Sequence, residues 1–175
     1  MVGQLNRNLE NWLSADNIMF SQNGSARLQW LLNLTPRPKE WVFPGGSITI
    51  SLFEASSFCY VNGQFLASMI LGLSFVEHTL NSLFAAAGRK GQEDMDIETL
   101  GREALAEGLI TKDIFNDIVD AVNKRNTILP FRKPLSIQAV DDHFDKERRL
   151  EPSGYEADAK RVMVAVSHFL DKSSI

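Results

Sequence analysis

The sequence predicts an all-α protein: an antiparallel helical bundle over residues 51–175, preceded by an N-terminal extension of helices and loop over residues 1–50. The first observation is periodicity, because residues 52–88, 111–128 and 155–171 each carry apolar side chains at helical spacing. The second is composition. A chain of 175 residues with 44% hydrophobic and 23% charged residues is typical of one globular domain with a sizeable core. The matching apolar faces should therefore meet in one bundle.

The net charge and the cysteine count exclude several classes of protein. A net charge of -4 disfavours a dedicated duplex-DNA binder, which usually has a basic balance. The single cysteine, Cys59, excludes an internal disulfide, and its apolar surroundings predict a buried side chain. Residues 1–10 are polar and lack a signal-peptide run, and Glu77 and His78 interrupt the apolar stretch over residues 65–87. We therefore expect a cytoplasmic protein with no membrane span.

The N-terminal extension is predicted to hold two short helices and a loop. Residues 4–14 and 25–34 carry apolar residues at helical spacing. Residues 35–46 contain three of the six prolines and a Gly-Gly pair, which is typical of a loop. Residues 47–51 alternate between serine or threonine and isoleucine, so they are expected to form a short extended piece.

The central helix of the predicted bundle covers residues 52–88. Ser51 and Glu54 have the spacing of a capping box at its start. Apolar residues occupy more than one face of this segment, which is typical of a helix surrounded by other helices. Gly63 and Gly72 lie within it, where each costs about 1 kcal/mol relative to alanine. Their expected use is the close approach of a neighbouring helix.

Shorter segments complete the predicted bundle. Asp96 is the expected cap of a short helix, and residues 111–128 form a longer helix that should end before Pro130. A loop then leads to the last helix, over residues 155–171. The predicted core face of that helix consists of Tyr155, Ala159, Val162, Met163, Val166 and Phe169.

Two polar sites interrupt the apolar faces of the predicted helices. Glu77 shares a stripe with apolar residues, where an unpaired buried carboxylate would be costly. It either reaches water at the margin of the core or pairs with Arg125 on a neighbouring helix. Asn126 projects near the centre of an apolar face, with Arg125 at the edge. Asn126 either caps the end of its helix or bonds to backbone or to a partner chain.

The segment over residues 124–133 is basic in an otherwise acidic protein. It is the best local candidate for binding the phosphate of RNA or of a nucleotide. The candidate phosphate-binding residues are Lys124, Arg125, Asn126, Arg132 and Lys133. The alternative is a solvated helix end, at which cations lie near the negative end of the helix dipole.

The three histidines form no recognisable catalytic or metal motif. His78 is expected to be a packed, hydrogen-bonded side chain, and His168 is expected to be exposed. His143 lies among the carboxylates of residues 141–145, but their spacing is not diagnostic of a divalent-metal site. The sequence also lacks a phosphate loop, a dinucleotide fingerprint and a zinc-helix motif. We therefore expect neither a metal nor a cofactor.

Two blocks of the sequence resemble the HEPN superfamily of small helical-bundle proteins. Residues 63–80, GQFLASMILGLSFVEHTL, look like the long helix of that family with its embedded acidic residue. Residues 108–126, GLITKDIFNDIVDAVNKRN, look like the helix that ends in the Arg-Asn motif of the family. Residues 156–159 fit the closing helix, so the resemblance covers residues 52–172.

The resemblance implies the parts of a ribonuclease site, one of which this sequence lacks. In many members an arginine holds the scissile phosphate, and a histidine a few residues further on moves a proton to or from the ribose hydroxyl. Arg125 and Asn126 match this motif, whereas Pro130 and the two residues after it supply no imidazole. Catalysis in the family usually needs a dimer. The resemblance therefore also implies a homodimer whose interface includes the Arg125 region.

Three functions follow as hypotheses. The first, which the missing histidine favours, is a non-catalytic HEPN-like dimer that binds RNA, a nucleotide or a protein partner, in a defence or toxin–antitoxin type system. The second is a metal-independent ribonuclease that uses a substitute histidine, either His78 or His143. The third is a purely structural or regulatory interaction protein, in which Arg125 serves only as a salt-bridge partner.

Overall fold

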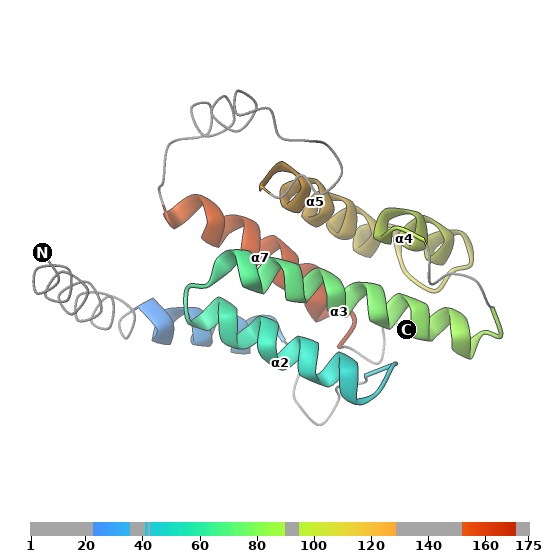
Figure 1. Ribbon diagram of the computed structural model, residues 1–175, viewed down its shortest axis with the longest axis horizontal. Helices are drawn as coiled ribbons and strands as arrows, with labels where there is room; N and C mark the ends of the chain where they lie inside the picture. The colour runs from blue at the N-terminus through green and yellow to red at the C-terminus, as the bar shows by residue number, and fades with distance from the viewer. Residues whose placement is uncertain (1–22, 36–40, 42, 90–94, 129–151, 171–175) are drawn as a thin grey trace, which may run out of the picture.

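Helices make up most of the part of the chain that the structure describes. The computed structural model describes residues 23–35, 41, 43–89, 95–128 and 152–170. Within these ranges the only strand-like residue is an isolated bridge at position 41, so the all-α prediction is confirmed. A helix over residues 23–34 is followed by α2 (Ser47–Val61), α3 (Phe65–Ala86), α4 (Ile97–Ala106), α5 (Lys112–Ile128) and α7 (Pro152–His168), as Figure 1 shows. The helix predicted over residues 4–14 lies outside the described ranges.

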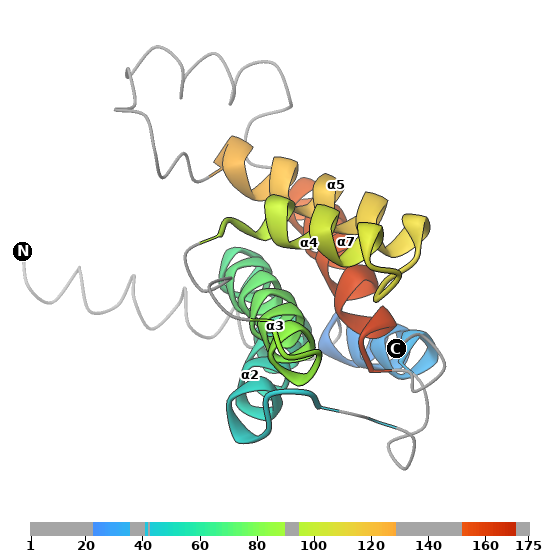
Figure 2. The same cartoon turned by 90° about the vertical axis from the view of Figure 1, so that its right-hand side faces the viewer.

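The bundle is built around α3. This helix contacts α2, α4, α5 and α7. Figure 2 shows α2 on one side of α3, with α4 and α5 on the other. α7 contacts α3, α5 and α2, so it joins the two sides. The largest fully buried side chains come from all of these elements and include Tyr60, Phe75, Phe84, Phe169, Met69, Leu73, Leu100 and Ile118.

The prediction of one central helix over residues 52–88 is wrong, because the segment forms two helices joined by a tight turn. Gly63 adopts a φ of 72°, a left-handed conformation that glycine accepts readily. Its N–H donates to the Tyr60 carbonyl at 3.1 Å, and the Gln64 N–H donates to the Cys59 carbonyl at 2.8 Å. These two bonds form a Schellman motif that ends α2. The chain then reverses, and α3 returns alongside α2 as an antiparallel hairpin.

The start of α2 also differs from the prediction. Residues 47–51, expected to be extended, form the first turn of this helix. The Thr49 hydroxyl donates to the Gly46 carbonyl at 2.9 Å, which holds that turn. Ser51 and Glu54 therefore lie inside the helix and form no capping box. A short alternating segment needs a partner strand to be extended, and the described chain offers none. The predicted boundary between the N-terminal extension (residues 1–50) and the bundle (residues 51–175) therefore falls inside α2.

The close helix approach predicted for Gly72 is confirmed. A Cβ atom added at this position would lie 2.7 Å from Val162 Cγ1 of α7 and 3.1 Å from the Ser56 hydroxyl of α2. The Ser56 hydroxyl in turn donates to the Ser68 carbonyl of α3 at 2.9 Å. Glycine at this position therefore lets three helices meet at one level of the core.

Other predicted element ends agree with the structure. The Asp96 carboxylate accepts a hydrogen bond from the Thr99 N–H at 2.9 Å and so caps α4. α5 ends at Ile128, ahead of Pro130. The core face predicted for the last helix is confirmed, except that Tyr155 is only partly buried.

The helix over residues 23–34 packs on the same core. Leu31 is buried, and the rings of Trp30 and Tyr60 lie with their centroids 5.2 Å apart. This part of the N-terminal extension therefore shares its apolar contacts with α2.

Among the described helices, α3 alone is long and apolar enough to cross a membrane, by length and composition. A core helix of a helical bundle passes the same test, and 44% of its apolar window is buried inside the protein. Its four neighbouring helices cover this part of its surface. Packing within the bundle thus accounts for the apolar character of α3.

Candidate functional site

Arg125 and Asn126 lie in the last turn of α5, where the sequence predicts a phosphate-binding site. Arg125 is partly exposed, and Asn126 is exposed rather than centred on an apolar face as predicted. The Nε and Nη2 atoms of Arg125 donate to the Asn126 Oδ1 atom at 3.2 and 3.0 Å. The amide therefore holds one edge of the guanidinium. Nη1 makes no hydrogen bond within the described part of the chain.

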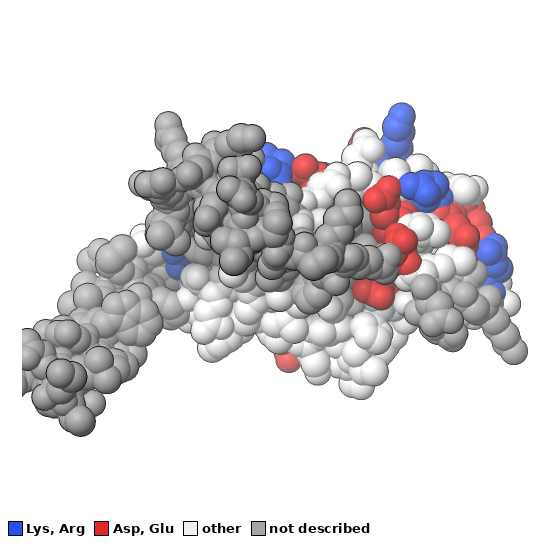
Figure 3. Space-filling model, turned by 45° about the horizontal axis from the view of Figure 1, so that its top comes forward, with Lys and Arg blue, Asp and Glu red and all other residues white. Residues whose placement is uncertain are grey.

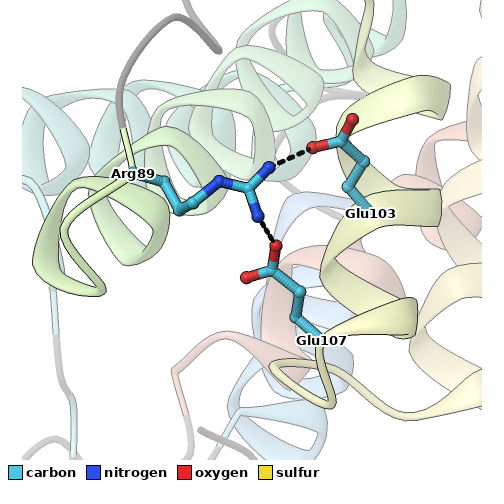
Figure 4. A network of polar contacts seen from close by, with 3 residues as sticks. All are labelled: Arg89, Glu103 and Glu107. Atoms are coloured by element: carbon cyan, nitrogen blue, oxygen red, sulfur yellow. Dashed lines mark hydrogen bonds and ion pairs between the residues drawn. The ribbon is translucent and has the colours of Figure 1, made fainter.

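Arg125 differs from the other arginines of the described chain, because no carboxylate there pairs with it. The pairs of the others are Arg27–Glu156, Arg89–Glu103, Arg89–Glu107, Arg102–Glu98 and Arg161–Asp120. Figure 4 shows one example, in which Arg89, which follows α3, reaches the carboxylates of Glu103 in α4 and of Glu107 at the C-terminal cap of α4. Within the described chain, no carboxylate neutralises the charge of Arg125.

Lys124, the neighbouring cation, is engaged by α7. Its ammonium group lies 3.8 Å from the Asp158 carboxylate. Two further pairs connect the same helices along their length: Asp120–Arg161 at 2.7 Å and Asp117–His168 at 2.9 Å. Pairs of this kind, at or near the surface, contribute about 0–1 kcal/mol each. These pairs align α5 with α7. The charge of Lys124 is partly neutralised by Asp158, whereas no described carboxylate pairs with Arg125.

The expected pair between Glu77 and Arg125 is not formed. Arg125 bonds to Asn126 instead, and no ion pair joins it to Glu77 in the described chain. Glu77 is partly exposed on α3, where water solvates its carboxylate, so it needs no partner. Leu66 and Ile70 of the same predicted stripe are also exposed, whereas Leu73, Leu80 and Phe84 are buried. Glu77 therefore lies at the margin of the core.

Neither histidine of the described chain is hydrogen-bonded to Arg125. His168 is held by Asp117, eight positions before Arg125 or about 12 Å along α5. His168 is partly buried, and His78 is exposed on α3 rather than packed, so both predictions for these side chains are corrected. His143 lies outside the described residues. Within them, no hydrogen bond joins an imidazole to Arg125 or Asn126.

Several predicted residues of the basic segment fall outside the described chain. These are Pro130, Arg132 and Lys133. Among the residues that the structure describes, no group of histidine, cysteine and carboxylate side chains could hold a metal ion. Cys59 is buried, as predicted, and burial raises the pKa of its thiol, which disfavours the reactive thiolate.

A second polar cluster, which sequence reasoning missed, joins the N-terminal helix to the bundle. Arg27 Nη1 donates to the Val61 carbonyl at 3.3 Å, and Arg27 Nε lies 3.5 Å from the Glu156 carboxylate of α7. The guanidinium also lies 4.9 Å from the centre of the Phe65 ring. The Tyr60 hydroxyl is buried without a hydrogen-bond partner, and burial together with the Glu156 charge raises its pKa. This cluster draws on four elements, so no local sequence signal could identify it.

The site at the end of α5 can bind an anion but has no described group suited to proton transfer. A guanidinium cannot give up its proton near neutral pH, and an asparagine amide does not titrate. Comparisons with protein-family models, with curated proteins and with solved structures found no match to this chain.

Proposed function

We propose that this chain is a non-catalytic helical-bundle domain of HEPN-like type that binds RNA through a phosphate group at Arg125. The observation that best supports this is the partly exposed guanidinium, which lacks a carboxylate partner in the described chain and is held on one edge by Asn126. The resemblance of the Arg-Asn pair to the HEPN motif supports the same assignment. On this proposal the protein acts in the cytoplasm, in a defence or toxin–antitoxin type system.

The energetics favour a ligand over a purely structural role for Arg125. A cation near the C-terminal end of a helix gains about 0.3–1 kcal/mol from the helix dipole. A hydrogen bond to a charged group contributes about 1.5–3 kcal/mol, and a guanidinium can make two parallel bonds to one phosphate. Because Asn126 already orients the guanidinium, less rotamer entropy is lost when the phosphate binds. The interaction of Arg125 with a phosphate would therefore be stronger than its interaction with the helix dipole.

Among the described residues, the same site lacks the group that RNA cleavage needs. Attack by the ribose 2′-hydroxyl needs a base, and the departing oxygen needs an acid. A positioned group of this kind contributes about 10²–10⁴-fold to the rate. The sequence has Pro130 where the HEPN motif has its histidine. His78 is exposed on α3 and makes no hydrogen bond with Arg125 or Asn126, which disfavours it as a substitute. Binding without turnover is the function that fits these residues.

Fluorescence anisotropy with a labelled single-stranded RNA tests the proposal. We expect saturable binding at low salt that weakens as salt rises, because phosphate contacts release counterions from the RNA. Arg125→Ala should weaken binding at least about tenfold, since the loss of one charge-assisted contact is worth at least about 1.4 kcal/mol. Asn126→Ala should have a smaller effect, because the guanidinium remains but is no longer held.

Arg102→Ala is the matched control. Arg102 lies on α4 and pairs with Glu98 on the same helix, so this change removes one positive charge without touching α5. Its RNA affinity should stay close to that of the natural protein. Equal losses in Arg102→Ala and Arg125→Ala would mean that net charge alone governs binding. An unchanged affinity of Arg125→Ala would contradict the proposed site.

A further inference from the structure

The charge of the protein limits how it can bind RNA. The net charge is -4, so extended contact between basic residues and phosphates is expected to supply only part of the affinity. On the face that Figure 3 shows, positive and negative side chains of the described residues lie side by side without a broad basic area. Single strands offer a second source of affinity, because their unpaired bases stack on aromatic side chains. A surface for a base beside Arg125 would therefore complete the proposed site.

The end of α5 lies at the same end of the bundle as the start of α7. Three ion pairs join the two helices: Asp117–His168, Asp120–Arg161 and Lys124–Asp158. The numbers rise along α5 as they fall along α7, so the two helices are antiparallel. The start of α3 lies near the start of α7, because Arg27 lies over the Phe65 ring and also pairs with Glu156. Figure 1 shows these three helix ends at one end of the molecule.

Arg125 and Tyr155 each continue the buried stripe of their helix to this end of the bundle. Arg125 lies seven positions, or about two turns, after the fully buried Ile118. Tyr155 lies seven positions before Val162, which is fully buried and faces Gly72 of α3. Both side chains are therefore directed toward the neighbouring helices. Each is only partly buried, because it lies in the terminal turn of its helix.

Two apolar side chains of α3 lie beside the end of α5. Leu66 and Ile70, one turn apart, are 39% and 38% exposed. Leu66 lies eighteen positions, or five turns, before Phe84, so the two side chains point the same way. Phe84 faces the side of α4, because Arg89 lies over its ring and pairs with Glu103 of α4. Figure 2 shows α4 and α5 on the same side of α3, and at the start of α3 this side faces the end of α5.

We infer that Tyr155, Leu66 and Ile70 form a surface that binds an unpaired base beside Arg125. The inference rests on the proposed binding of RNA at Arg125, and it makes the ligand a nucleotide of a single strand rather than an isolated phosphate. Arg125 holds the phosphate, the Tyr155 ring stacks on the base, and the two aliphatic side chains contact the same base. A base in a duplex is stacked between its neighbours, so single strands should bind more tightly than duplexes.

Fluorescence anisotropy with two labelled probes of equal length tests the inference. One probe is a single-stranded RNA, and the other is the same strand with every base removed. The natural protein should bind the RNA more tightly than the abasic strand. Tyr155→Ala should weaken binding of the RNA at least about fivefold, as expected for the loss of one base–aromatic stack, and leave binding of the abasic strand unchanged. Tyr155→Phe keeps the ring and should bind both probes like the natural protein.

Phe58→Ala is the matched control. Phe58 is 65% exposed on α2, which lies on the other side of α3 from α5, so this change removes an exposed ring away from the site. Both affinities should stay unchanged. Leu66→Ser is a second test of the same surface and should weaken binding of the RNA at least about twofold. Circular dichroism checks folding, and Leu66→Ser decides the result if Tyr155→Ala does not fold, since Leu66 is outside the core.

The two probes separate this inference from the proposed function. Unchanged RNA affinity in Tyr155→Ala, or equal losses for the RNA and the abasic strand, would overturn the base-binding surface and leave the phosphate site at Arg125 in place. Equal affinities of the natural protein for both probes would do the same. Arg125→Ala should weaken binding of both probes. If it changes neither affinity, or if the natural protein does not bind the RNA, the proposed function fails and the inference fails with it.

Discussion

Two buried hydroxyl groups on α2 differ in whether they are satisfied. The Ser56 hydroxyl donates to the Ser68 carbonyl at 2.9 Å, whereas the Tyr60 hydroxyl has no hydrogen-bond partner in the described chain. A satisfied hydrogen bond contributes about 0.5–1.5 kcal/mol to stability, and an unsatisfied buried group costs about 1–3 kcal/mol. The Ser56 hydroxyl should therefore stabilise the folded protein, and the Tyr60 hydroxyl should destabilise it.

Tyr60→Phe should leave the free energy of unfolding unchanged or raise it by up to about 1 kcal/mol, because it removes an unsatisfied group and keeps the ring. Ser56→Ala, its matched comparison, should lower that free energy by about 1 kcal/mol. Urea unfolding followed by circular dichroism measures both. A loss above about 1 kcal/mol in Tyr60→Phe would show that the hydroxyl has a partner such as a bound water.

Gly72→Ala tests the contact between α3 and α7. The added methyl group would lie 2.7 Å from Val162 Cγ1, so we expect destabilisation of about 1–3 kcal/mol despite the better helix propensity of alanine. Gly154→Ala in α7 is the control. A Cβ atom there meets nothing within 4 Å, so it should be neutral or stabilise by up to about 1 kcal/mol. Equal stabilisation by both changes in thermal unfolding would rule out the close approach.

At the scale of helices, one turn decides the arrangement of the bundle. Gly63, Gly88 and Gly108 end three successive helices with φ values of 72°, 77° and 72°. The same pair of Schellman hydrogen bonds satisfies each helix end. Gly88 precedes a charged stretch, which marks a helix end in the sequence. Apolar residues continue on both sides of Gly63, so periodicity does not separate α2 from α3, but the dipeptide Asn62-Gly63 is a turn signal that marks the helix end.

The predictable features of the candidate site are those that depend on residues close together in the chain. The cap at Asp96 and the end of α5 before Pro130 follow from local rules, and the Arg-Asn pair was visible as a motif. That no carboxylate of the described chain pairs with Arg125 depends on which helices are its neighbours, so no local pattern reveals it. The pairing of Glu77 was wrong because periodicity places a residue on a face of a helix but does not say where that face meets water.

Gly63→Ala should lower the free energy of unfolding by about 1–2 kcal/mol, because a residue with a Cβ atom resists the left-handed conformation. Gly108→Ala is matched to it, since it has the same φ and the same motif but open space around its Cβ position. At Gly63 the added Cβ would lie 3.2 Å from Arg27 Nη1, so this variant should lose more stability. Urea unfolding measures both variants. If Gly63→Ala loses less stability than Gly108→Ala, the contact with Arg27 Nη1 plays no role.

At the scale of the whole molecule, the proposed RNA site lies at the end of α5, on the other side of α3 from α2, as Figure 2 shows. This end of α5 offers the Arg125 guanidinium to a phosphate.

Binding and cleavage of the same labelled single-stranded RNA, measured in one sample, give the most direct test of the proposed function. The natural protein should bind the RNA and leave it intact, because Arg125 can hold a phosphate but no described group near it can transfer a proton. Arg125→Ala should bind weakly and also leave the RNA intact. Robust cleavage by the natural protein that Arg125→Ala abolishes would contradict the proposal.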